Sequence, residues 1–403
     1  ARAGPGARGL RPPGWAAERA SPSPRAAGSR SLAEGGPRRL RGAGPRTLRR
    51  ALGSFRSDLL VHSRCFQDPA QAFEGPPPSP PPGAPRLLVL VAVEEPFDWD
   101  SIPAAGTAVS MELGRLPELQ AELQSRGHRP CYALDYLAVE ANGELFGEWA
   151  RAGGALIGAH LHPWVNPPFG RDESGQSFGA NLPPDLEASK LANLFGLIRA
   201  RTGVAPLLYQ AGRYGVGLQT LAQLESHGIE LDASLSPGFD YAHLGGPDFR
   251  RFDSRPRWYR GGRVLSVPVT GGYLGALSGL GPHLHRSVEA GLARRARLPA
   301  LLDRAGLYGR LRLSPEGNSE RDLRRLTESL LARGERLFTL YLHSSSLVAG
   351  ATGYARDAAG VEALLARTLA YADWFQRALG GQPADHLALL EHFRSAHRAA
   401  LGS

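Results

Sequence analysis

The chain has 403 residues, enough for one large α/β domain or two ordinary ones. Its formal net charge of +9 lies almost entirely in residues 1–86, which hold 15 arginines against 5 acidic residues. The rest of the chain holds 32 basic and 33 acidic residues, and so balanced a composition argues against a nucleic-acid partner. Two cysteines cannot form a disulfide framework, and no apolar run approaches the ~20 residues of a membrane span.

These features predict a protein without a transmembrane segment, in a reducing, cytoplasmic compartment. Export stays open, because the chain starts at Ala1 and its only methionine is Met111. The sequence does not indicate the oligomeric state.

Residues 1–85 are rich in Gly, Pro, Ala, Arg and Ser and close with a proline run at 76–82. Such a composition cannot bury enough apolar surface to offset the entropy lost on ordering. We therefore expect a disordered N-terminal tail or linker over residues 1–85, a folded body over 86–380 and a C-terminal helical tail over 381–403.

From residue 86 onward, apolar strand patterns alternate with helical ones. Residues 87–93 form a continuous apolar run, typical of a strand that is covered on both faces. A helix is expected over residues 111–126. Further strands are expected at residues 129–134, 155–159, 206–211, 229–235, 264–269 and 336–342.

Three later helices show apolar stripes at helical spacing, centred on residues 191–198, 323–330 and 361–369. The second of these follows a capping-box pattern at residues 319–322. Alternating strands and helices predict an α/β fold with a mostly parallel sheet, either a barrel or a doubly wound sheet. We favour the barrel, because polar residues follow several different strands and barrels build their sites at that rim.

The first strand is followed by four carboxylates within seven residues, at Glu94, Glu95, Asp98 and Asp100. Packing does not explain such a group at a strand end, although a solvated acidic turn is the alternative interpretation.

The third strand ends in His160 and His162, which are two residues apart and so point to the same side of an extended segment. Imidazoles are common zinc ligands, and two of them with one carboxylate leave room for water and substrate. The alternative is a pair of hydrogen-bonded histidines at a strand end. Trp164, close behind, either lines a sugar-binding lip or anchors a packed loop.

Three more polar residues follow later strands. Arg213 stands in a glycine-rich turn, and Asp232 lies in an apolar stretch where a buried carboxylate needs a partner, for which Arg213 is the candidate. His343 ends the last long strand, where it either donates a proton to a leaving group or bonds to the serines that follow. The second His-x-His pattern, at residues 283–285, opens a helix without nearby carboxylates and is not expected to bind metal.

Taken in order, these segments resemble the NodB-type polysaccharide deacetylases, within them a WalW-like branch. The similarity spans residues 86–380. The matching segments are VEEPFDW (93–99), IGAHLHPWVNPPF (157–169), QAGRYG (210–215), DASLSP (232–237), LSPEG (313–317) and LHSSSLVAGATGY (342–354).

This resemblance implies a distorted (β/α)7 barrel and a divalent metal, with zinc as the first expectation. It also implies removal of N- or O-acetyl groups from a glycan or glycolipid. Glu94 matches the carboxylate ligand and His160 the first histidine ligand, while His343 matches the proton donor. Arg213 and Asp232 match a pair that orients the catalytic base.

The sequence departs from the family pattern twice. Ala92 stands two residues before Glu94, where the family commonly has an Asp that acts as base, so Glu95 or Asp98 is the expected substitute. Many relatives have their second histidine at the position of Trp164, and here His162 is expected to replace it. The leading hypothesis is a metal-dependent deacetylase-like hydrolase. A catalytically silent barrel that binds metal or glycan and an amidase acting on another C–N bond are the alternatives.

Overall fold

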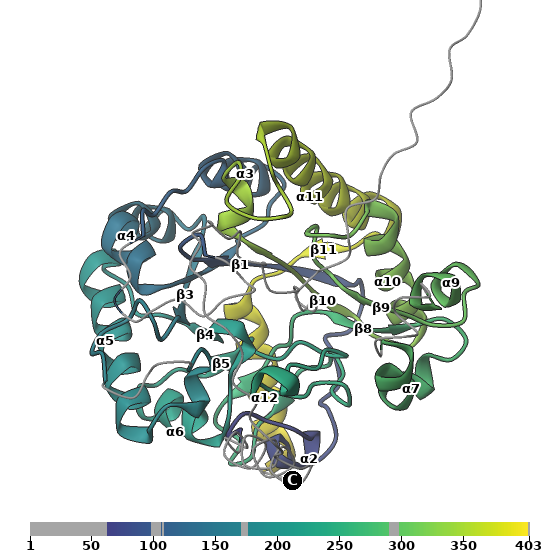
Figure 1. The fold of residues 1–403 in the computed structure, drawn as a ribbon, viewed down its shortest axis with the longest axis horizontal. Coiled ribbons are helices and arrows are strands. Elements are labelled where there is room, and N and C mark those ends of the chain that lie inside the picture. The colour runs from purple at the N-terminus through teal and green to yellow at the C-terminus, as the bar shows by residue number, and fades with distance from the viewer. Residues whose placement is uncertain (1–62, 98–105, 107–108, 171–175, 290–297, 402–403) are drawn as a thin grey trace, which may run out of the picture. The chain divides into compact units, whose positions relative to one another are not determined.

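The computed structural model describes residues 63–97, 106, 109–170, 176–289 and 298–401. Within these residues, a nine-stranded sheet contains a run of seven adjacent parallel strands, in the order β10-β1-β2-β3-β4-β5-β7. Their bounds are Arg86–Val93 (β1), Cys131–Leu134 (β2), Leu156–Leu161 (β3), Leu208–Ala211 (β4), Leu231–Asp232 (β5), Leu265–Ser266 (β7) and Leu337–His343 (β10). Figure 1 shows the sheet surrounded by helices.

The predicted fold class is confirmed, since each of the seven expected strands overlaps one of these parallel strands. Among the residues that the structure describes, the sheet does not close through a regular ladder. Instead, the chain beyond β7 meets β10 through single bonds, from the Thr339 N–H to the Thr270 hydroxyl (2.8 Å) and from the Tyr341 N–H to the Leu313 carbonyl (3.0 Å). The barrel is therefore distorted on this side.

The main helices that connect the parallel strands are α3 (Leu116–Ser125), α4 (Tyr136–Arg151), α5 (Pro184–Thr202), α6 (Leu218–Ser226), α10 (Glu320–Ala332) and α11 (Ala358–Leu379). The helix expected over residues 111–126 starts later, at Leu116, with Pro117 in its first turn, a position that suits proline. The predicted capping box is present, because Ser319 and Asp322 exchange hydrogen bonds at the start of α10. Asp135 caps α4 in a similar way, accepting from the Ala138 N–H.

Short elements complete the body. β6 (Arg257–Trp258) pairs antiparallel with β7, and β11 (Gln382–Pro383) pairs parallel with the start of β1. A second sheet consists of β8 (Gly271–Leu274) and β9 (Gly309–Arg312), with α7 (Gly281–Val288) and α9 (Leu298–Arg304) between them in the chain. In the described part of the chain, the remaining helices are α2 (Pro69–Ala72), α12 (His386–Leu401) and five 3₁₀ turns at Gly179–Asn181, Gly212–Tyr214, Ala242–Leu244, Ser278–Leu280 and Ser344–Leu347.

Residues 63–74 form an ordered strap, which corrects the expectation that disorder extends to residue 85. Phe66 and Phe73 are buried and lie against the ring of Tyr259, with centroid distances of 5.7 and 5.2 Å. Cys65 forms a β-bridge with Gly217. Aromatic burial, which the proline- and glycine-rich composition obscured, fixes this segment on the body.

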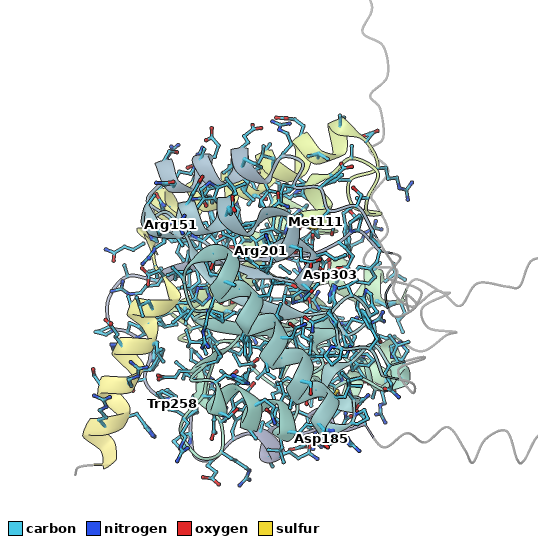
Figure 2. The ribbon with its side chains drawn as sticks, turned by 90° about the vertical axis from the view of Figure 1, so that its left-hand side faces the viewer. Met111, Arg151, Asp185, Arg201, Trp258 and Asp303 are labelled. Atoms are coloured by element: carbon cyan, nitrogen blue, oxygen red, sulfur yellow. The ribbon has the colours of Figure 1, made fainter. Side chains whose placement is uncertain are left out.

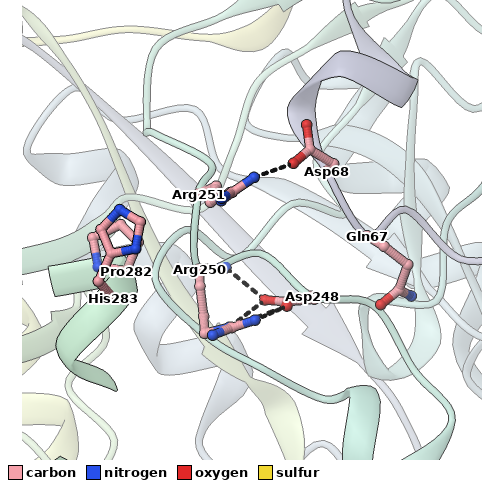
Figure 3. Close-up of a pocket in the computed structure, with 7 residues that line it drawn as sticks. All are labelled: Gln67, Asp68, Asp248, Arg250, Arg251, Pro282 and His283. Carbon is pink, nitrogen blue, oxygen red and sulfur yellow. Dashed lines mark hydrogen bonds and ion pairs between the residues drawn. The ribbon is translucent and has the colours of Figure 1, made fainter. Parts of the chain in front are cut away.

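A surface pocket of ≈ 240 Å³ lies where the strap meets the body (Figure 3). Its charged groups are paired with one another: Arg251 with Asp68 at 2.8 Å, and Arg250 with Asp248. These ion pairs hold the strap and the loop at residues 248–251 in place. Because these charged groups pair with one another, the pocket does not indicate a binding site.

The expected C-terminal tail packs onto the body. Leu389, Leu390 and Phe393 of α12 are buried, and His397 stacks on Trp258 of β6 at 4.9 Å. Figure 2 shows the labelled Trp258 beside the yellow helix α12. None of the helices in the described residues is long and apolar enough to cross a membrane.

Candidate metal centre

The carboxyl ends of β1, β3 and β10 bring polar side chains together in the interior. Glu94 and Glu95 directly follow β1, His160 lies in β3 and His162 just beyond it, and all four are buried. Because the side chains of a strand alternate, the two histidines share one face, with ring centroids 4.5 Å apart.

Glu94 lies between the two imidazoles. Its Oε2 atom is 3.2 Å from His160 Nε2 and 3.4 Å from His162 Nε2. The Ser345 hydroxyl donates to the other carboxylate oxygen at 3.3 Å, and the backbone N–H of Glu94 donates to the Ser344 hydroxyl at 3.1 Å. The serines after β10 thus hold Glu94 in its orientation.

The remaining ring nitrogens define the tautomers. His160 Nδ1 is 2.8 Å from the Gln210 carbonyl, which can only accept, so Nδ1 carries the proton and Nε2 keeps a lone pair. His162 Nδ1 lies 3.0 Å from Glu95 Oε2 and 3.1 Å from Oε1. Among the described residues, no hydrogen-bond partner meets the buried His162 Nε2 atom.

Burial sets the charges of this cluster. It lowers the pKa of His160 to about 4 and that of His162 well below its usual range, so both rings are neutral at neutral pH. Burial also raises the pKa of Glu94 to about 8, which the nearby His343 partly counteracts.

The donor set fits a divalent metal. One ligand atom each from Glu94, His160 and His162 lies within 4.8 Å of the others, and the orphaned His162 nitrogen points to the same place. Two neutral imidazoles and one carboxylate are ligands that zinc accepts while keeping a position open.

Glu95 lies at the opposite edge of the His162 ring from Glu94. It accepts a hydrogen bond from the Trp164 indole at 2.6 Å, and its backbone N–H donates to Asp135 at 3.2 Å. Trp164 is itself buried and stacks on His162 with centroids 4.3 Å apart, so it is a packed anchor and not an exposed sugar-binding lip.

The Glu95 neighbourhood is also buried. Burial raises the pKa of Glu95 to about 7, while Asp135 lowers it. Burial and then Glu95 raise the pKa of Asp135 well above its usual range.

His343, at the end of β10, has a partner that the sequence analysis missed. Its Nδ1 atom lies 2.8 Å from Glu316 Oε2, and its backbone N–H donates to Glu316 Oε1 at 3.0 Å. The Tyr341 hydroxyl meets Nε2 at 3.0 Å. Burial opposes the charged imidazolium, but Glu316 and Glu94 outweigh it and raise the pKa of His343.

Glu316 lies in the LSPEG segment, which the family resemblance included without giving it a role. A carboxylate in a loop before α10 carries no periodic signal, so only its contact with His343 identifies it. Burial opposes its charged form, but His343 lowers its pKa, as expected for an ion pair.

The expected pairing of Arg213 with Asp232 is not formed. Asp232 accepts from the Ser234 hydroxyl at 2.5 Å and from the Tyr259 hydroxyl at 2.7 Å, whereas Arg213 lies over the Phe178 ring at 5.6 Å. Hydroxyl groups therefore satisfy the buried carboxylate in place of a guanidinium. Arg213 and Tyr214 have positive φ angles of 52° and 64°, which marks a sharp turn after β4.

Asp98, one of the two expected bases, lies outside the described residues, as does Asp100. His283 and His285 lie in α7, where they form part of no carboxylate–histidine cluster among the described residues.

No family model matches the chain, and neither does any curated protein. Several solved structures are similar to it. A protein assigned as a polysaccharide deacetylase from Mycobacterium smegmatis is 16% identical, with 81% of this chain and 96% of that chain covered and a TM-score of 0.46. PuuE allantoinase is 13% identical, with 80% and 95% covered and a TM-score of 0.48.

A pseudoenzyme of the CE4 family from Bacillus anthracis is 9% identical, with 79% of this chain and 68% of that chain covered and a TM-score of 0.36. At these identities the similarity concerns the fold alone. The WalW-like branch stays a prediction.

Proposed function

We propose that this chain is a NodB-type, metal-dependent hydrolase that removes an acetyl group from a glycan or glycolipid. The observation that carries the proposal is the convergence of Glu94, His160 and the orphaned Nε2 of His162 on one buried point. A cytoplasmic location and the absence of a nucleic-acid partner stay predictions.

Glu94, His160 and His162 would hold the metal, preferably zinc. Bound there, the metal would polarise the acyl carbonyl and lower the pKa of a water molecule. The chain's own residues supply the surroundings. The Gln210 carbonyl fixes the tautomer of His160, and burial of the cluster excludes bulk water.

His343 is the proposed proton donor to the leaving nitrogen or oxygen. Glu316 holds its Nδ1–H and stabilises the imidazolium, so that Nε2 can release a proton once the Tyr341 hydroxyl gives way. Arg213 and Asp232 stay proposed as supporting residues, each through its own contacts and not as a pair.

A metal-binding but catalytically silent barrel is the second candidate, and Ala92 favours it. Ala92 is buried in β1, paired with His343 of β10 and Ala133 of β2, and offers no carboxylate where the resemblance implies a base.

The test is elemental analysis of protein purified without a metal-affinity tag, together with acetate release from acetylated chitooligosaccharides and model acetyl esters. Metal at about one ion per chain with acetate release supports the hydrolase. Metal without acetate supports the silent barrel.

Two variants test the ligands. His160→Ala and Glu94→Ala each remove one ligand and should reduce metal retention at least tenfold, while His283→Ala, in the other His-x-His pattern, should retain it. Circular dichroism confirms that each variant folds. Normal metal content in both folded ligand variants would refute the assignment of the site.

A further inference from the structure

The environment of His162 is more constrained than a ligand role alone requires. Its ring is stacked on Trp164, meets the edge of Phe97 at 5.2 Å, and is hydrogen-bonded to Glu95 through Nδ1. Glu95 and Trp164 also bond to each other. The side chains of Glu95, Trp164 and His162 thus contact one another pairwise, and each fixes the position of the other two.

We infer that Glu95 and Trp164 form a clamp that positions His162 for metal binding, and that Glu95 is a positioning residue and not the catalytic base. This inference rests on the proposed metal site. It replaces the role that the sequence suggested for Glu95.

The first argument is the direction of the hydrogen bonds. An indole N–H can only donate, so Glu95 Oε1 is an acceptor toward Trp164. As a carboxylate Glu95 can only accept, so its Oε2, 3.0 Å from His162 Nδ1, takes the Nδ1–H, which leaves the lone pair of the ring on Nε2, the atom that faces Glu94. Glu95 therefore selects the tautomer that a metal needs.

The second argument is position. Nδ1 and Nε2 lie on different edges of an imidazole ring, so Glu95 is separated from the Glu94 side of the cluster by His162 itself. Both oxygens of Glu95 already accept hydrogen bonds, and the side chain is fully buried. A base must reach the water whose proton it takes, and His162 stands between Glu95 and the point where Glu94 and the two histidines converge.

A metal site at Glu95 and Asp135 is one competing interpretation of these contacts. Ligand atoms of Glu95, Asp135 and His162 also lie within 4.8 Å of one another, so these residues could themselves bind a cation. In that case His162 would bridge two ions, and the protein would take up two per chain. The clamp predicts one.

Substitution of Glu95 separates the two roles. Glu95→Gln keeps the shape, but its amide must turn an NH₂ group toward Trp164 or His162. Either one of the two bonds is lost, or His162 switches to the Nε2–H tautomer and loses the lone pair that a metal needs. We expect zinc affinity to fall 10- to 100-fold in Glu95→Gln and Glu95→Ala, measured by competition with a chromophoric chelator. Trp164→Phe keeps the stacking on His162 and loses only the indole N–H donor, so zinc affinity should fall less in this variant.

The exposed Glu118 on α3 provides the matched control, since Glu118→Gln should leave zinc affinity unchanged. Unchanged zinc affinity in Glu95→Gln, combined with a large loss of acetate release, would instead identify Glu95 as the base. Two zinc ions per wild-type chain would also overturn the clamp.

A readout without metal distinguishes failure of the clamp from failure of the proposed function. In metal-free protein, ¹⁵N NMR of the imidazole rings should show His162 in the single Nδ1–H tautomer, and a mixture of tautomers in Glu95→Gln. A single tautomer in a wild-type protein that binds no zinc would support the clamp and reject the metal site. Averaged tautomers in the wild type would reject the clamp.

Discussion

Individual side chains in the cluster acquire their chemical states from partners that are remote in sequence. His343 shows this most clearly, because its pKa is raised although burial alone would lower it. The carboxylate of Glu316, 27 residues earlier in the chain, makes the difference. A proton donor has to be protonated when substrate binds, so this ion pair extends the pH range in which His343 can act.

We therefore predict that Glu316→Gln lowers the pKa of His343 and shifts the alkaline limb of the acetate-release profile to lower pH. Above that limb the imidazole is neutral and has no proton to give, so activity at pH 8 should fall at least tenfold. Glu316→Asp retains the negative charge and should recover part of the pH range in which His343 is protonated. An alkaline limb at the same pH in Glu316→Gln would identify another group as the acid.

At the scale of elements, the strap of residues 63–74 changes where the folded body begins. Its aromatic residues fill space beside Tyr259, next to β6, and its backbone bridges to Gly217 at the start of α6. β6 is only two residues long and ends the sheet. An edge strand exposes backbone N–H and C=O groups, so it needs such covering. Removing residues 63–85 would consequently uncover apolar surface, whereas the sequence alone suggested a disordered tail or linker over residues 1–85.

Phe73→Ala tests the strap. Phe73 is 8% exposed, and truncating a buried phenylalanine typically costs about 3–5 kcal/mol in the free energy of unfolding. We expect a loss of about 3 kcal/mol by urea denaturation, since the strap lies at the edge of the body. Leu218→Ala is the control, being 57% exposed, and should change stability by less than about 0.5 kcal/mol. Equal stability of both variants would mean that the strap contributes nothing.

For the whole molecule, the buried cluster links metal binding to stability. Three ligands at the carboxyl ends of β1 and β3 converge only in the folded chain, so a metal that binds there stabilises the native state. Zinc at 100 times its Kd should add about 2.7 kcal/mol, seen as a rise in Tm that a chelator reverses. The gain should vanish in Glu94→Ala and persist in Glu118→Gln. An unchanged Tm for the wild type would argue against a preformed site.

The sequence by itself determined the alternation of strands and helices, the order of the seven parallel strands along the chain and the His160–His162 pair. These features depend on local periodicity, because side chains repeat every two residues in a strand and every 3.6 in a helix. The carboxyl ends of parallel strands meet at one rim of the sheet by topology alone, which explains why Glu94 could be placed beside the histidines.

Only the tertiary structure decided the partners. Glu95 meets Trp164 across 69 residues and Glu316 meets His343, while Asp232 bonds to Tyr259 and not to Arg213. Such choices depend on distances of a few ångströms between side chains that come from separate elements, and no pattern along the chain encodes them. The ordered strap is similar, because its few aromatic residues become informative only where the body offers a surface to bury them.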